Sequence, residues 1–184
     1  MDTLIKSIDA EYRRYKALAE GAFGQVPEAA LSASGLNEGN SLAVMCWHIS
    51  GNLKSRFTDF LTADGEKPWR DRDEEFVARS VSREDFVAKW EEGWKVLLDT
   101  LGTLTDADLN KVVTIRGQPL PVHEALHRSM THTSYHVGQI VYLCHAIVGA
   151  GWKYLSIPPG GSAAYNTAPS MEKPAAHARS AAVR

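Results

Sequence analysis

Apolar residues recur every three or four positions in four long stretches of the chain, which is the spacing of amphipathic helices. The stretches cover residues 4–23, about 41–61, about 83–101 and about 121–148. Ser82, with Asp85 three positions on, is a predicted N-cap for the third stretch. Four long helices joined by connections of uneven length predict an all-α fold, built as a helix bundle.

The connections differ in composition. Pro and Gly residues predict a turn between residues 24 and 40. The segment 62–81, TADGEKPWRDRDEEFVARSV, is dense in charge, which predicts a long and mostly irregular loop after the second helix. Between Leu109 and Val122, a β-branched run followed by RGQP favours a small hairpin, although such a run can also form an extended loop.

The last segment of the chain, residues 156–184, is rich in Pro, Gly, Ala and Ser and has no amphipathic period. We expect an extended C-terminal arm that is either disordered or lies over a neighbouring subunit. The chain is thus divided into a helical domain, residues 1–155, and a C-terminal extension, residues 156–184.

Composition excludes several classes of protein. The chain has 184 residues, 44% of them hydrophobic and 23% charged, with a net charge of −2. These values are typical of soluble globular proteins and give no reason to expect nucleic acid or a membrane as partner. The longest apolar run, residues 140–150, is far shorter than the roughly 20 residues of a membrane span. The charged N-terminus lacks the apolar core of a signal peptide, so we expect a cytoplasmic protein.

Candidate chemistry lies in the histidines of the stretch THTSYHVGQI. The fourth predicted helix contains two pairs spaced by four residues, His123 with His127 and His132 with His136. Since each residue turns about 100° around a helix, the two pairs point to opposite sides. They therefore cannot serve one site. The side of His123 also carries an apolar stripe that includes Val137, and burial of this side either within the bundle or against another chain makes a homodimer an expected partner.

Two imidazoles one turn apart on an inward face can provide two ligands of a transition metal, as in helical zinc motifs. The third ligand must then come from another helix, and His48 in the second helix is the only histidine of the predicted bundle outside the fourth helix. Three imidazoles leave an open coordination position, which is typical of a reactive site. The alternatives are a chance spacing in a histidine-rich stretch, and a core histidine at position 48 that hydrogen-bonds a backbone carbonyl.

The segment HTSYHVGQI resembles the last-helix signature of the DinB-like (YfiT-like) superfamily of metalloenzymes. The segment HISGNLKSRFTDFLTADGEKPWRDRDEEF resembles one uncharacterised subgroup, a domain of unknown function, and WKYLSIPPGGSAAYN extends the likeness over most of the chain. The resemblance implies an up-and-down four-helix bundle, usually dimeric, whose metal is held by one histidine of the second helix and two of the last. Those residues are His48, His132 and His136 here.

The resemblance also bears on cofactors. Some superfamily members are similar to transferases or isomerases that use a low-molecular-weight thiol, with the metal lowering the pKa of that thiol. The metal itself varies, and three histidines suit zinc, nickel or iron. Near the ligands, Gln139 and Asn52 could orient a histidine or contact a metal-bound ligand, or could be helix-packing amides.

The loop after the second helix contains residues that could bind a substrate. Arg70 and Arg72 could grip a carboxylate or phosphate with paired hydrogen bonds, and Trp69 could form an apolar wall. Alternatively, these cations pair with the acidic residues of the same loop, which are Asp71, Asp73, Glu74 and Glu75.

The functional hypothesis is a metal-dependent enzyme acting on a small molecule, either a thiol-dependent S-transferase or a hydrolase. The sequence has no nucleophile elbow, phosphate-binding glycine loop or dinucleotide fingerprint, so any chemistry must come from the metal. The alternatives are a non-catalytic metal-binding protein and a metal-free dimeric scaffold.

Overall fold

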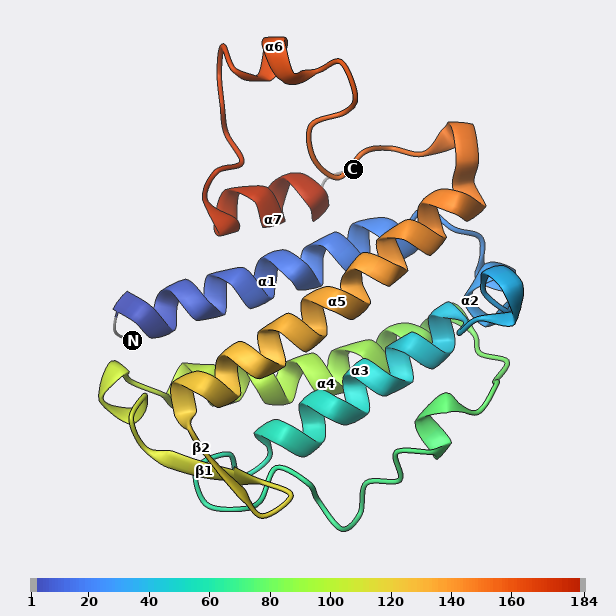
Figure 1. Cartoon of the computed structure of the whole chain (residues 1–184). Helices are drawn as coiled ribbons and strands as arrows, with labels where there is room; N and C mark the ends of the chain where they lie inside the picture. Colours follow the sequence, from blue (N-terminus) through green and yellow to red (C-terminus); the bar gives the residue numbers. More distant parts are fainter. Residues whose placement is uncertain (1–2, 183–184) are drawn as a thin grey trace.

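The computed structural model describes residues 3–182, and most of them are helical. Four long helices lie side by side around one apolar core (Figure 1). They are α1 (Thr3–Phe23), α3 (Leu42–Phe57), α4 (Arg83–Thr103) and α5 (Val122–Val148). Trp90 and Trp94 of α4 are fully buried in this core together with Tyr12 of α1. None of the helices within residues 3–182 is both long and apolar enough to span a bilayer.

The helix ends follow local hydrogen bonding. Ser82 Oγ accepts a hydrogen bond from the Asp85 backbone N–H at 3.0 Å, which confirms the predicted N-cap of α4. Helix α3 ends at Phe57 instead of Leu61, because Thr58 leaves the helical conformation with ψ 126°. Asp59 then adopts a positive φ of 49°, which prevents the helix from resuming.

A two-stranded hairpin corrects the all-α prediction. Strands β1 (Val112–Ile115) and β2 (Gln118–Pro121) pair antiparallel. Arg116 and Gly117 between them both have positive φ, 56° and 71°, which is the turn geometry that suits the twist of paired strands. The favoured hairpin is therefore confirmed, and the fold is mostly helical with a small β element.

Short helices fill parts of the connections. The predicted turn after α1 contains α2 (Glu28–Ser32), which buries Leu31. The charged loop at residues 62–81 is irregular apart from the 3-10 helix η2 (Glu74–Phe76). Three further 3-10 turns are η1 (Leu36–Glu38), η3 (Asp106–Asp108) and η4 (Gly149–Gly151).

The C-terminal arm differs from both expectations, because its described part folds back on its own chain. It contains α6 (Ser162–Tyr165) and α7 (Pro174–Ala182), and α7 lies against α1 (Figure 1). Ala181 is buried there, and a Cβ at Gly21 of α1 would lie 2.8 Å from the Ala181 carbonyl oxygen. Small residues make this contact, so the arm has no strong amphipathic period. The division at residue 155 stays a prediction, and its outermost residues 1, 2, 183 and 184 lie outside the described part.

Close packing of α3 on α4 yields a stability prediction. A Cβ at Gly93 of α4 would lie 2.5 Å from Ser50 Cα, a backbone atom of α3 that cannot move independently. We expect Gly93→Ala to lower the free energy of unfolding by about 1–3 kcal/mol, as overpacking does. Chemical denaturation measures this change. Gly102→Ala, on the same helix with open space around it, is the control and should stabilise by up to about 1 kcal/mol. Equal effects of the two substitutions would contradict the close approach.

Candidate metal centre

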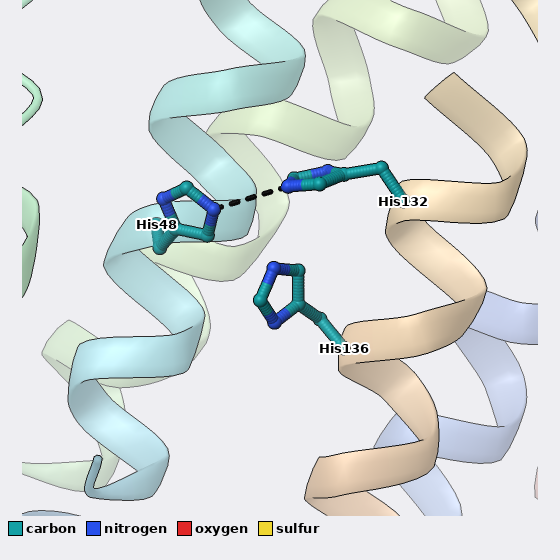
Figure 2. A group of neighbouring side chains, drawn as sticks. All are labelled: His48, His132 and His136. Atoms are coloured by element: carbon teal, nitrogen blue, oxygen red, sulfur yellow. Dashed lines mark hydrogen bonds between the residues drawn. The ribbon is translucent and has the colours of Figure 1, made fainter. Parts of the chain in front are cut away.

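Three imidazoles from two helices meet at one point (Figure 2). His48 projects from α3, and His132 and His136 project from successive turns of α5. One ligand atom from each lies within 4.8 Å of the others, and the Nε2 atoms of His48 and His132 are 3.2 Å apart. Zinc to nitrogen bonds of 2.0–2.1 Å in a tetrahedral site place two ligand nitrogens about 3.4 Å apart. The distance between the Nε2 atoms of His48 and His132 is therefore already close to the one that a bound metal requires.

Hydrogen bonds fix which nitrogen of two histidines faces the cluster. His48 Nδ1 donates to Glu75 Oε2 at 2.9 Å, and His136 Nδ1 donates to Gln139 Oε1 at 2.8 Å. A neutral imidazole has only one N–H, so Nε2 keeps its lone pair in both rings. Both histidines are thus in the tautomer that binds a metal through Nε2.

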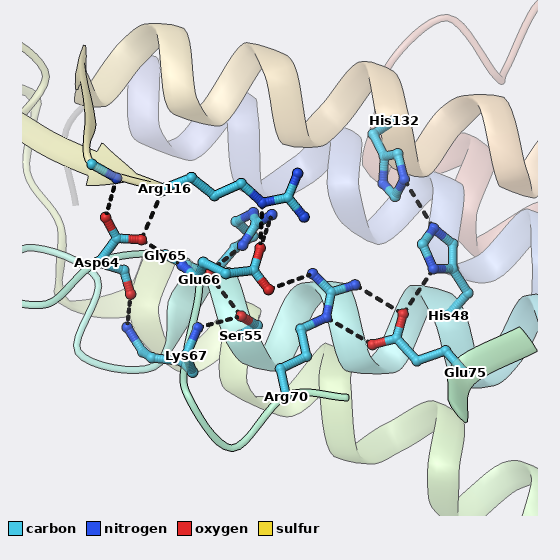
Figure 3. Close-up of polar contacts among 12 residues, drawn as sticks. His48, Ser55, Asp64, Gly65, Glu66, Lys67, Arg70, Glu75, Arg116 and His132 are labelled. Atoms are coloured by element: carbon cyan, nitrogen blue, oxygen red, sulfur yellow. Dashed lines mark hydrogen bonds and ion pairs between the residues drawn. The ribbon is translucent and has the colours of Figure 1, made fainter. Parts of the chain in front are cut away.

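Glu75 is itself held in place (Figure 3). Arg70 donates from Nε and Nη2 to the two oxygens of the Glu75 carboxylate, at 2.7 and 2.8 Å, and the side chains of both residues are buried. Burial acts to raise the pKa of Glu75, but the hydrogen bonds from His48 and Arg70 outweigh it and leave that pKa below its ordinary value. Glu75 is therefore an anion that orients His48.

Gly51 of α3 makes the room for this carboxylate. A Cβ at position 51 would lie 2.2 Å from Glu75 Oε1, which is closer than nonbonded atoms can approach. A side chain at this position would displace Glu75 from His48. The close approach of the Glu75 side chain to α3 thus requires glycine.

The environment keeps two of the histidines neutral. Burial lowers the pKa of His132 to about 4, and the positive charges of nearby Arg70 and Arg56 act in the same direction. Burial also lowers the pKa of His136. Since a metal binds the neutral imidazole, protons do not compete for these two nitrogens near neutral pH.

The histidines lie in the wall of a cavity of about 710 Å³, a volume within the usual range of small-molecule sites. The loop after α3 and the β hairpin complete the wall. Its apolar part includes Phe57, Phe60, Val113 and Ile115, and its polar part includes Asn52, Arg56, Arg70, Arg72, Arg116 and Arg128.

Some of the other predicted site residues line this cavity and others do not. Asn52, Arg70 and Arg72 line it, whereas Gln139 is exposed and contacts the cluster through His136. Trp69 is 51% exposed and does not line the cavity; its ring lies 5.5 Å from Lys54 Nζ. The guanidinium of Arg70 is already bound to Glu75. A role of any of these residues in substrate binding or catalysis stays a prediction.

The sequence did not lead us to predict the contact of Glu75 with His48 or the space that Gly51 leaves for it. Glu75 was grouped with the loop acids that neutralise loop arginines, and it does pair with Arg70, but inside the protein. A glycine three positions after His48, on a neighbouring face of the same helix, was the available signal for a close approach.

The second histidine pair does not share the site. Within residues 3–182, the one cluster that could hold a metal is that of His48, His132 and His136. His123 Nδ1 bonds the Leu109 carbonyl oxygen at 3.0 Å, and Val137 on the same side of α5 is buried in the core. This side is covered at least partly by the chain itself, so the homodimer stays a prediction.

Comparison with known proteins identifies the family of the chain. The sequence model of a protein family described as "Protein of unknown function (DUF1572)" matches residues 2–161. The chain belongs to the DUF1572 family. No curated protein and no solved structure matches it. The region shared with DUF1572 includes the four long helices and all three clustered histidines.

The contact between Glu75 and His48 predicts an effect on metal affinity. Glu75→Gln keeps the size of the side chain but removes the charge that fixes the His48 tautomer. We expect this substitution to weaken Zn²⁺ binding about 10–100-fold, measured by competition with a chelating dye. Glu74→Gln, at the exposed neighbouring position, is the control and should leave affinity unchanged. Equal affinity of the Glu75 variant and the wild type would rule out the orienting role.

The lowered pKa of His132 predicts a pH dependence of the metal-free protein. In the unfolded chain His132 binds its proton near pH 6.5, whereas in the folded chain it does so only near pH 4. The free energy of unfolding should therefore fall as the pH drops through this window. His132→Asn should make that fall shallower, and NMR titration of the His132 ring should give a midpoint well below 6.5. A midpoint at or above 6.5 would contradict the burial of this ring.

Proposed function

We propose that the protein is a metal-dependent enzyme that acts on a small molecule, with His48, His132 and His136 as ligands of a divalent transition metal. The supporting observation is the convergence of three imidazole nitrogens at the wall of a large cavity. A metal with an open coordination position would act there as a Lewis acid and lower the pKa of a bound water or thiol.

The proposal extends to the superfamily of the fold and to the oligomeric state. We infer that the four long helices form the up-and-down bundle of the DinB-like superfamily and that the protein acts as a homodimer in the cytoplasm. The order of the ligands supports this kinship, with one histidine on α3 and two on α5. Zinc, nickel and iron all suit the ligand set, and the reaction would be S-transfer from a low-molecular-weight thiol or hydrolysis.

Different residues of the cavity would bind the metal, orient its ligands and exclude water. The three histidines hold the ion through neutral nitrogens, and Glu75 with Gln139 orients two of them. Phe57 and Phe60 exclude water from part of the cavity, while Asn52 offers an amide to a ligand. Within residues 3–182 no further His, Cys, Asp or Glu joins the cluster, which favours an open reactive site over a closed structural one.

Metal content tests this function. Untagged wild-type protein reconstituted with Zn²⁺, Ni²⁺ or Fe²⁺ should bind about one ion per chain, measured by inductively coupled plasma mass spectrometry. His48→Ala and His132→Ala should each lose most of it, because two imidazoles bind a divalent ion far more weakly than three.

His127→Ala is the matched control. His127 belongs to the other four-spaced pair of α5 and is exposed, so its loss should leave the metal content unchanged. Stoichiometric metal in all three variants would point to adventitious binding. A wild type without metal after reconstitution would leave a metal-free scaffold, whose function must then be sought in its partners.

A further inference from the structure

The cavity wall is unusually rich in arginine. Five arginines line it and no aspartate or glutamate does, among the residues that the structure describes. A cavity lined by one sign of charge concentrates ligands of the opposite sign. The question is which of these guanidinium groups are free to bind such a ligand.

Three of the five arginines are already paired inside the protein. Arg70 is bound by Glu75, and Arg116 donates to the Glu66 carboxylate at 2.9 Å (Figure 3). Arg56 shares that carboxylate at 3.1 Å. These ion pairs build the wall of the cavity. They neutralise two of the three charges and leave little donor capacity for a ligand.

Arg72 and Arg128 have no ion-pair partner among residues 3–182, and both are exposed at the cavity. The Arg72 guanidinium lies 4.9 Å from the centre of the Phe76 ring, and that ring lies 4.7 Å from the ring of His48. Arg128 comes four residues before His132 on α5, one helical turn and about 6 Å along the axis. Arg72 is thus separated from His48 by one aromatic ring, and Arg128 from His132 by one helical turn.

We propose that the substrate or co-substrate of this site carries a carboxylate or phosphate group, which Arg72 and Arg128 bind while another group of the same molecule faces the three histidines. The proposal rests on the function proposed above, because it names the class of molecule that this site takes. Guanidinium groups bind both oxyanions through paired hydrogen bonds, which the lone charge of lysine cannot provide.

Anion binding by the metal-free protein tests the proposal. Metal-free wild-type protein would be titrated with inorganic phosphate and, separately, with succinate by calorimetry at constant ionic strength. At least one of the two should bind, and which one binds identifies the oxyanion. Arg72→Gln and Arg128→Gln should each weaken that binding about tenfold or more, as expected for loss of a charged hydrogen bond.

The controls separate this site from general charge and from the metal. Arg13→Gln, which removes an arginine of α1 outside the cavity, should bind the anion as the wild type does. If the wild type binds neither anion, or if both arginine variants bind it as the wild type does, the proposal is wrong. Anion binding in a protein that takes up no metal would support the arginine site and overturn the metal function alone.

Discussion

A buried carboxylate must be paired and fully hydrogen-bonded, because an uncompensated charge in the interior costs several kcal/mol. Glu75 meets this requirement with two partners, the guanidinium of Arg70 and the imidazole of His48. In this pairing the Glu75 carboxylate lies directly on α3, where Gly51 leaves room for it. A single interaction therefore holds part of the charged loop at the cavity and sets the tautomer of His48. Such a buried pair contributes specificity of arrangement more than net stability.

The other end of the loop is tied to the hairpin by a second carboxylate (Figure 3). Asp64 accepts hydrogen bonds from the backbone N–H groups of Glu66, Arg116 and Gly117, and these bonds lower the pKa of its carboxyl group. The Gly65 N–H also donates to the Thr114 carbonyl oxygen at 2.8 Å. Loop and hairpin thus form one continuous part of the cavity wall, which α3 and α5 complete.

Local patterns in the sequence were enough to predict the long helices, the Ser82 cap and the hairpin, since each depends on neighbours along the chain. The three-histidine cluster was also predictable, because helical spacing places His132 and His136 on one face. Glu75 and His48 are 27 residues apart and are joined by an irregular loop. The path of such a loop cannot be predicted from a periodic pattern of apolar residues. The packing of α7 on α1 was missed for a related reason, since alanine and glycine contacts give no apolar stripe. The position of Arg128 in the cavity wall was missed, because segments far apart in the sequence enclose this cavity.

The electrostatics of the site link the two proposals. Burial is the main cause of the lowered pKa of His132, and the positive charges of Arg70 and Arg56 act in the same direction. The positive charge that the unpaired arginines leave at the cavity would likewise disfavour a divalent cation at the three imidazoles, whose ring nitrogens carry no negative charge. An anionic ligand on Arg72 and Arg128 would offset that charge, so it should strengthen metal binding. By thermodynamic linkage the metal would then strengthen anion binding to the same degree. Three clustered imidazoles beside two unpaired arginines are therefore suited to the joint binding of a cation and an oxyanion that the two proposals describe.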